Sequence, residues 1–125
     1  MKIFLDTADI EEIRTAARWG VIDGVTTNPS LYAKVGGSYE AILQEICKLT
    51  SGPVSAEVIS DDVDGMLEEG RHFAKLAPNI VVKVAMSENG LEAISRFADE
   101  GIKTNCTLIF STNQELLAAK AGASL

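Results

Sequence analysis

Short apolar and β-branched runs alternate along the chain with longer runs in which apolar residues recur at helical spacing. The short runs predict five strands, at 2–5, 24–27, 54–58, 80–84 and 103–109. The longer runs predict helices at about 9–19, 38–51, 62–77, 89–100 and 112–121. The pattern is therefore a strand followed by a helix, five times over, and residues 123–125 resemble the start of a sixth strand.

Strands that are separated by helices run parallel, because each return connection is too long for a hairpin. The chain is therefore predicted to be an α/β protein, and two architectures fit: an open doubly wound sheet and a closed (β/α) barrel. Its 125 residues, taken as a single domain 1–125, favour the open sheet, since an eight-unit barrel usually needs about 200 residues or more.

Polar residues within the strands favour the barrel instead. Strands of an open doubly wound sheet are buried on both faces and are typically apolar throughout. Here all five strands carry polar residues at or near their C-terminal ends: Asp6, Thr26, Asn28, Glu57, Lys83, Asn105 and Thr107. In a (β/α) barrel such side chains converge on the C-terminal mouth, where active sites lie. Because side chains alternate along a strand, Cys106 and Leu108 are expected to point the other way, toward the covering helices.

Lys83 is the strongest single indication of chemistry. It lies between two valines in an apolar strand, where loss of solvation favours the neutral amine over the ammonium. A neutral amine can attack a ketone or aldehyde to form a Schiff base, and Asp6 and Glu57 supply carboxylates for proton transfer. Simpler interpretations exist for single residues: Lys83 could extend to solvent from a strand end, and Asp6 or Asn28 could cap a turn.

Composition and charge narrow the class of protein. An apolar content of 46% excludes intrinsic disorder, and a net charge of −7 argues against nucleic acid or an anionic membrane as a partner. With no signal peptide or membrane span recognisable, a cytoplasmic protein is expected. Cys47 and Cys106 lack metal-ligand spacing and are interpreted as free thiols, and His72 as a solvated helix position. No metal or organic cofactor is expected.

The strand motifs resemble those of transaldolases. The resemblance rests on Phe-Leu-Asp-Thr-Ala (4–8), Gly-Val-Thr-Thr-Asn-Pro-Ser (24–30), Ala-Glu-Val (56–58), Val-Val-Lys-Val (81–84) and Gly-Ile-Lys-Thr-Asn-Cys-Thr-Leu (101–108). It extends over essentially the whole chain and is strongest to the short subfamily that also includes fructose-6-phosphate aldolases. Small departures are Ala85, where proline is usual, and Ser87, where threonine is usual.

The resemblance implies a cofactor-free Schiff-base mechanism on a (β/α)8 barrel, of which this chain carries about the first five units. Lys83 matches the Schiff-base lysine, and Asp6 matches the acid/base that acts on the C4 hydroxyl of the sugar. Glu57 and Thr107 match the pair that positions and activates the catalytic water.

The resemblance also implies the substrate class. Asn28 and Asn105, with Thr26, match the groups that hold the hydroxyls of a dihydroxyacetone unit. That unit would pass from sedoheptulose 7-phosphate or fructose 6-phosphate to an aldose phosphate, in the pentose phosphate pathway. Fructose-6-phosphate aldolases typically have glutamine where this chain has Glu57, so transaldolase is favoured and the aldolase, a lyase, is the alternative.

Three further barrel units, with a phosphate-binding arginine and a serine near the Schiff base, would follow residue 125 in the family. We therefore expect either a truncated chain or a sheet that a second copy or a complementing chain completes. Two functions of other classes remain open: a catalytically silent structural or oligomerising piece, and a receiver-like signalling module. The receiver needs adjacent acidic residues after the first strand and a lysine on the fifth, whereas Thr7 follows Asp6 and Lys83 lies on the fourth.

Overall fold

The computed structural model describes residues 1–125, which form five strands and six helices. The strands are β1 (Phe4–Asp6), β2 (Gly24–Thr26), β3 (Val54–Glu57), β4 (Ile80–Ala85) and β5 (Thr104–Thr107). The helices are α1 (Ile10–Trp19), α2 (Pro29–Val35), α3 (Tyr39–Leu49), α4 (Val63–Ala74), α5 (Glu88–Asp99) and α6 (Thr112–Ala121). All five predicted strands and all five predicted helices are present.

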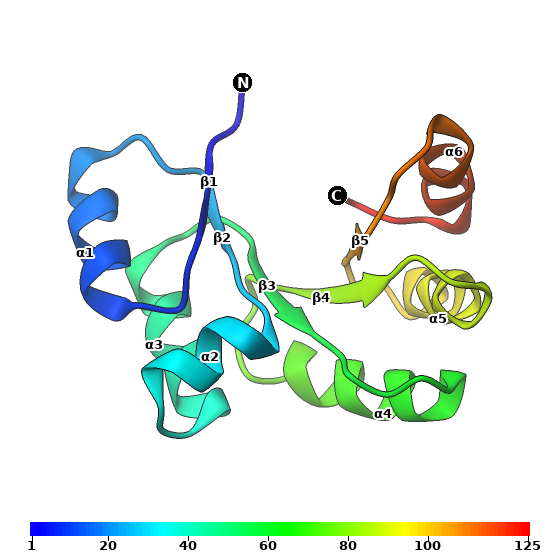
Figure 1. Ribbon diagram of the computed structural model, residues 1–125, viewed down its shortest axis with the longest axis horizontal. Helices are drawn as coiled ribbons and strands as arrows, with labels where there is room; N and C mark the ends of the chain where they lie inside the picture. Colours follow the sequence, from blue (N-terminus) through cyan, green and yellow to red (C-terminus); the bar gives the residue numbers. More distant parts are fainter.

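The order of the strands decides between the two architectures. All four strand pairs are parallel, and the order in the sheet is β1-β2-β3-β4-β5, the same as the order in the sequence. A doubly wound sheet instead reverses its strand order and carries helices on both faces. Here the strands form an inner arc and the helices an outer arc (Figure 1). The sheet is a curled half-barrel, so the (β/α) barrel prediction is confirmed, and the open sheet that length favoured is wrong.

The hydrophobic core lies between the sheet and the outer helices. Its fully buried side chains include Val25, Val54, Val82 and Val84 from the strands and Ile13, Leu43, Ile46, Ile94 and Phe97 from the helices. Cys106 is buried on this side of β5, as alternation predicts. Leu108 is not: it has a φ of 62° and is 56% exposed. Because its left-handed backbone turns the chain out of the strand, β5 ends at Thr107 rather than at residue 109.

Helix α2 was not predicted from the sequence. Its seven residues are too few to display a helical period, although its start carries two recognisable signals. The Asn28 side chain accepts a hydrogen bond from the Leu31 amide at 3.0 Å, and Pro29 occupies the first helical turn. The capping interpretation of Asn28 is therefore correct. Helix α2 begins at Pro29, three residues after β2 ends at Thr26.

Residues 124 and 125 continue the sheet pattern beside β5. The Leu125 amide donates to the Thr104 carbonyl at 3.2 Å, and the Cys106 amide donates to the Leu125 carbonyl at 3.0 Å. Alternating bonds of this kind are those of a parallel ladder. They agree with the prediction that a sixth strand begins here.

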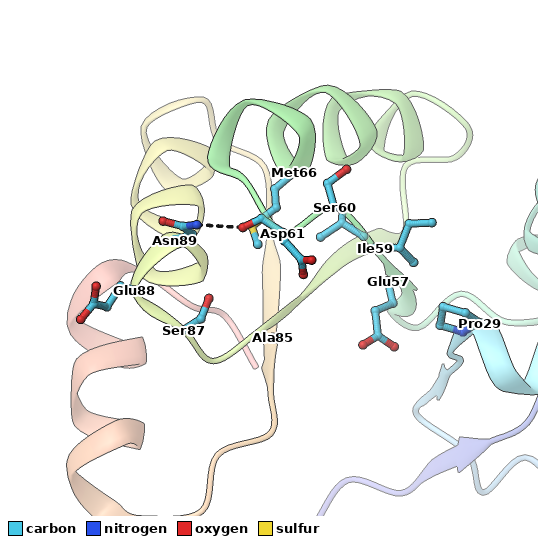
Figure 2. Close-up of a pocket in the computed structure, with 11 residues that line it drawn as sticks. Pro29, Glu57, Ile59, Ser60, Asp61, Met66, Ala85, Ser87, Glu88 and Asn89 are labelled. Carbon is cyan, nitrogen blue, oxygen red and sulfur yellow. Dashed lines mark hydrogen bonds between the residues drawn. The ribbon is translucent and has the colours of Figure 1, made fainter.

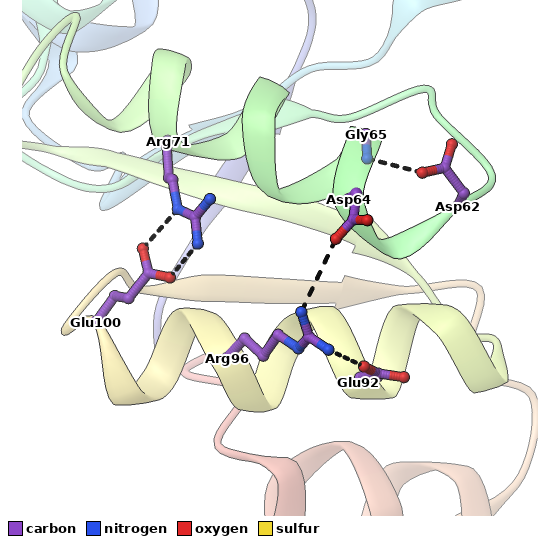
Figure 3. A network of polar contacts seen from close by, with 7 residues as sticks. All are labelled: Asp62, Asp64, Gly65, Arg71, Glu92, Arg96 and Glu100. Atoms are coloured by element: carbon purple, nitrogen blue, oxygen red, sulfur yellow. Dashed lines mark hydrogen bonds and ion pairs between the residues drawn. The ribbon is translucent and has the colours of Figure 1, made fainter.

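Several ion pairs lie on the outer surface at α4 and α5 (Figure 3). Arg71 pairs with Glu100, and Arg96 pairs with Glu92 and more distantly with Asp64. The arginine side chains are about half exposed, and such pairs contribute little to stability because water and salt screen them. Packing beneath them therefore holds the two helices together. None of the six helices combines the length and the apolar composition of a membrane span.

Both cysteines are free thiols, as predicted. Burial raises the pKa of Cys47 to about 11. Since the thiolate is the reactive form and exists above the pKa, the reactive fraction of Cys47 at pH 8 is about a hundredfold below that of an ordinary thiol. We expect iodoacetamide to alkylate Cys47 slowly in the native protein and rapidly in urea, measured by peptide mass spectrometry. Equal rates in both states would contradict this assignment.

Candidate active site

Three of the predicted site residues form one row across the concave face of the sheet. The strand register places Glu57 beside Lys83 and Lys83 beside Asn105. All three are half-buried: Glu57 ends β3, Lys83 is the fourth residue of β4, and Asn105 is the second residue of β5. The row lies at the level where β3 ends, toward the side of the sheet on which a (β/α) barrel carries its active site. The register thus brings an amine, a carboxylate and an amide together from segments that lie far apart in the sequence.

The Lys83 amine has two polar contacts. Its Nζ lies 3.4 Å from Glu57 Oε2 and donates a hydrogen bond to the Thr27 carbonyl at 3.2 Å. The Lys83 side chain is only 12% exposed and that of Glu57 only 19%. The sequence predicted apolar surroundings for Lys83, and the structure adds a carboxylate next to its amine.

Asp6 and Thr26 form a second, separate group. They are paired in the register of β1 and β2, and the Thr26 hydroxyl donates to Asp6 Oδ1 at 2.9 Å. Asp6 is exposed, which leaves its second carboxylate oxygen accessible from the concave side. No hydrogen bond or ion pair joins this group to Lys83.

The two remaining predicted residues lie at the rim. Asn28 follows β2 and uses Oδ1 to cap α2, so its amide nitrogen is the group left for a ligand. Thr107 ends β5 and pairs with Ala85 in the register, and its hydroxyl has no hydrogen-bond partner. Alternation places Thr107 on the same face as Asn105, as predicted.

Sequence reasoning missed two residues that connect these groups. The Asn105 amide donates to Ser55 Oγ at 3.0 Å, and the Thr27 hydroxyl donates to the Ser55 carbonyl at 2.7 Å. Both Ser55 and Thr27 are fully buried. A signal was present for Ser55, because it is a polar residue two positions before Glu57 and therefore on the same strand face.

An open cavity of about 580 Å³ lies beside this row, at the ends of β3 and β4 and the starts of α4 and α5 (Figure 2). Glu57, Ala85 and Ser87 line it, together with Pro29, Val58, Ile59, Ser60, Asp61, Met66, Glu88 and Asn89. Asn89 closes part of the wall by donating to the Asp61 carbonyl at 2.8 Å. A polar molecule in the cavity would contact the Glu57 carboxylate directly. No group of three or more His, Cys, Asp or Glu side chains is arranged to hold a metal ion.

Comparison with known proteins agrees with this geometry. The sequence model of the transaldolase/fructose-6-phosphate aldolase family matches residues 3–125, almost the whole chain. The chain belongs to this family. The resemblance inferred from the strand motifs is thereby confirmed, and the half-barrel is a part of the family's barrel.

Its curated relatives in the transaldolase/fructose-6-phosphate aldolase family are named probable transaldolases. One from Desulforapulum autotrophicum is 59% identical, one from Clostridium botulinum strain Hall 58%, and one from Methanococcus maripaludis 55%. Each alignment covers 99% of this chain and 57–58% of the relative. The chain therefore spans somewhat more than half the length of these relatives.

Proposed function

We propose that this chain carries the Schiff-base part of a transaldolase site. It would transfer a dihydroxyacetone unit from sedoheptulose 7-phosphate or fructose 6-phosphate to an aldose phosphate. The observation that carries the proposal is the row of Glu57, Lys83 and Asn105, in which a largely buried amine lies 3.4 Å from a carboxylate. A buried amine with an adjacent proton acceptor is the arrangement that nucleophilic lysine catalysis requires.

In the first step, the neutral Lys83 Nζ attacks the ketose carbonyl and water leaves, which forms an iminium ion on the lysine. Glu57 can take the proton that the ammonium must lose, since it is the carboxylate next to Nζ. With Thr107, Glu57 would also position the water that enters and leaves at this carbon.

In the second step, Asp6 removes the proton from the C4 hydroxyl, the C3–C4 bond breaks and the aldose phosphate leaves. The electron pair of that bond stays on the lysine-bound dihydroxyacetone unit as an enamine. The enamine attacks the acceptor aldehyde, Asp6 returns its proton to the new hydroxyl, and water releases the product from Lys83. The Thr26 hydroxyl, which donates to Asp6 Oδ1, would hold the carboxylate in a fixed orientation for this role.

The proposal also includes the partners. Asn28, Asn105 and Thr26 would hold the sugar hydroxyls, and the pathway would be the cytoplasmic pentose phosphate pathway, with no cofactor. A second copy or a complementing chain would cover the sheet at β1 and at residues 124 and 125, which themselves bond β5. The exposed apolar side chains of Phe110, Leu116 and Leu117 near β5 and on α6 support such a cover, because apolar surface of this kind favours association.

Incubation of the 125-residue chain with sedoheptulose 7-phosphate and glyceraldehyde 3-phosphate tests the proposal. The expected products are erythrose 4-phosphate and fructose 6-phosphate in equal amounts, measured by mass spectrometry after size-exclusion chromatography of the protein. If the chain forms neither product nor a covalent adduct with the donor, the catalytically silent alternative holds.

Glu57 also tests transaldolase against the aldolase alternative. The Glu57→Gln variant keeps the size of the side chain but removes its charge and its capacity to accept a proton. We expect the ratio of released dihydroxyacetone to transferred dihydroxyacetone to rise about tenfold or more, because glutamine at this position is typical of fructose-6-phosphate aldolases, which release dihydroxyacetone directly. Asp61→Asn, which removes a carboxylate from the same cavity, serves as the matched control and should leave the ratio unchanged. An unchanged ratio in Glu57→Gln would refute this role.

A further inference from the structure

Ser55 is a polar residue on the concave face of the sheet, two positions before Glu57 on β3. It lies one level below the row of Glu57, Lys83 and Asn105, and its side chain is fully buried. Interior positions of (β/α) barrel strands are usually filled by bulky branched residues. A buried hydroxyl costs free energy unless it is hydrogen-bonded, and an alanine would fit the same space without that cost. A serine at this position therefore requires an explanation. The hydrogen bond from Asn105 is the only one that its hydroxyl makes with a side chain.

That contact crosses a whole strand. Ser55 lies on β3 and Asn105 on β5, with β4 between them. In a flat sheet these two strands would be about 10 Å apart, too far for a hydrogen bond of 3.0 Å between two short side chains. The curl of the sheet brings their inner faces together. The Asn105 side chain therefore extends across β4 toward β3. It lies beside Lys83, which is its partner in the strand register.

The contact fixes what Asn105 can offer to a ligand. Ser55 accepts a hydrogen bond from the Asn105 amide, and no protein group makes a hydrogen bond with the amide oxygen. A ketone bound to Lys83 Nζ would place its substituents next to this oxygen. A fixed amide recognises a hydroxyl at one position, whereas a mobile amide would lose orientation and affinity.

We propose that Ser55 is a positioning residue, which holds Asn105 so that the site discriminates hydroxylated ketones from ketones without hydroxyls. The inference rests on the proposed Schiff-base function and deepens it. Ser55 itself does not touch the substrate and acts only through Asn105. Thr27 supports the arrangement from the other side, because its hydroxyl bonds the Ser55 carbonyl while its own carbonyl accepts from Lys83.

The test compares dihydroxyacetone with acetone as partners of Lys83. The amine adds to the ketone, water leaves, and borohydride delivers hydride to the iminium carbon, so that a stable secondary amine is measured as added mass. For Ser55→Ala we expect the dihydroxyacetone concentration that gives half-maximal trapping to rise about tenfold, the value of one hydrogen bond of about 1.4 kcal/mol. The half-maximal concentration of acetone should not change. The Ser55→Ala, Asn105→Ala double variant should be no worse than Asn105→Ala alone.

Thr104→Val is the matched control. Thr104 is also fully buried on a strand, but its hydroxyl has no partner, so its removal should change neither ketone's trapping. Equal loss of trapping for both ketones in Ser55→Ala would indicate a purely structural role, and no loss for either would refute positioning; both outcomes overturn the proposal.

Absence of the proposed Schiff-base function would give a different result from absence of the positioning role. The parent chain would then trap neither ketone on Lys83. In that case the side-chain amide signals of Asn105 in the NMR spectrum still decide the contact: Ser55→Ala should shift them and speed their hydrogen exchange. Unmoved signals would overturn the inference on their own.

Discussion

Replacing Lys83 with methionine is expected to abolish covalent trapping of fructose 6-phosphate by borohydride, and with it any transfer activity. Methionine matches the length of the buried stem but has no nitrogen to attack a carbonyl. Intact-protein mass spectrometry should show the reduced adduct in the parent chain and none in Lys83→Met. Because covalent catalysis depends wholly on this nitrogen, the loss should exceed a factor of about a thousand.

Lys103→Met is the matched control for this prediction. Lys103 lies just before β5, is exposed, and stands at the opposite end of the strands from Glu57, so its removal should leave trapping intact. Circular dichroism should confirm that Lys83→Met is folded. An adduct that persists in Lys83→Met, on any other peptide, would show that Lys83 is not the Schiff-base residue and would refute the proposed function.

Truncation of Phe97 to alanine is expected to have the largest effect on stability. Phe97 is fully buried on α5, and its ring lies against α4 at Gly70, where the glycine has no side chain. Loss of a buried phenylalanine costs about 3–5 kcal/mol, a large part of the roughly 5–15 kcal/mol by which native proteins are stable. Urea denaturation followed by circular dichroism should show a large fall in the midpoint or an unfolded chain.

Gly70→Ala keeps this prediction testable even if Phe97→Ala does not fold. A Cβ at Gly70 would overlap the Phe97 ring at Cζ, so the substitution should cost about 1–3 kcal/mol by overpacking. Combining it with Phe97→Leu should cost less than the sum of the two, because the smaller side chain vacates the space that the new methyl needs. Additive costs would refute the contact. Phe110→Ala, which removes an 83% exposed phenylalanine, should change stability by no more than about 0.5 kcal/mol.

Much of the local structure followed from the sequence. Apolar spacing predicted five strands and five helices, and alternation correctly separated buried Cys106 from Asn105 and Thr107. Prediction failed where local signals were short or where backbone conformation overrode the pattern. Helix α2 has too few residues to show a period, and β5 stops two residues early because Leu108 adopts a left-handed conformation that no apolar pattern reveals.

The polar residues at the strand ends were also found from the sequence, together with the family that their motifs resemble. What the sequence could not supply was which of them touch. Thr26 donates a hydrogen bond to Asp6, and Lys83 forms an ion pair with Glu57. Asn105 donates a hydrogen bond to Ser55, across the strand that carries Lys83. The last contact depends on how strongly the sheet curls, which is a property of five strands together and not of any one of them.

By itself, the sequence determined the alternation of strands and helices, the polar residues near the strand ends and the resemblance to the family. Only the tertiary structure decided the strand order, the row of Glu57, Lys83 and Asn105, and the buried serine below it. The reason is physical: periodicity is set by neighbours a few residues apart, whereas register and curvature are set by packing between segments 20 to 50 residues apart, as in the Thr26–Asp6 and Asn105–Ser55 bonds.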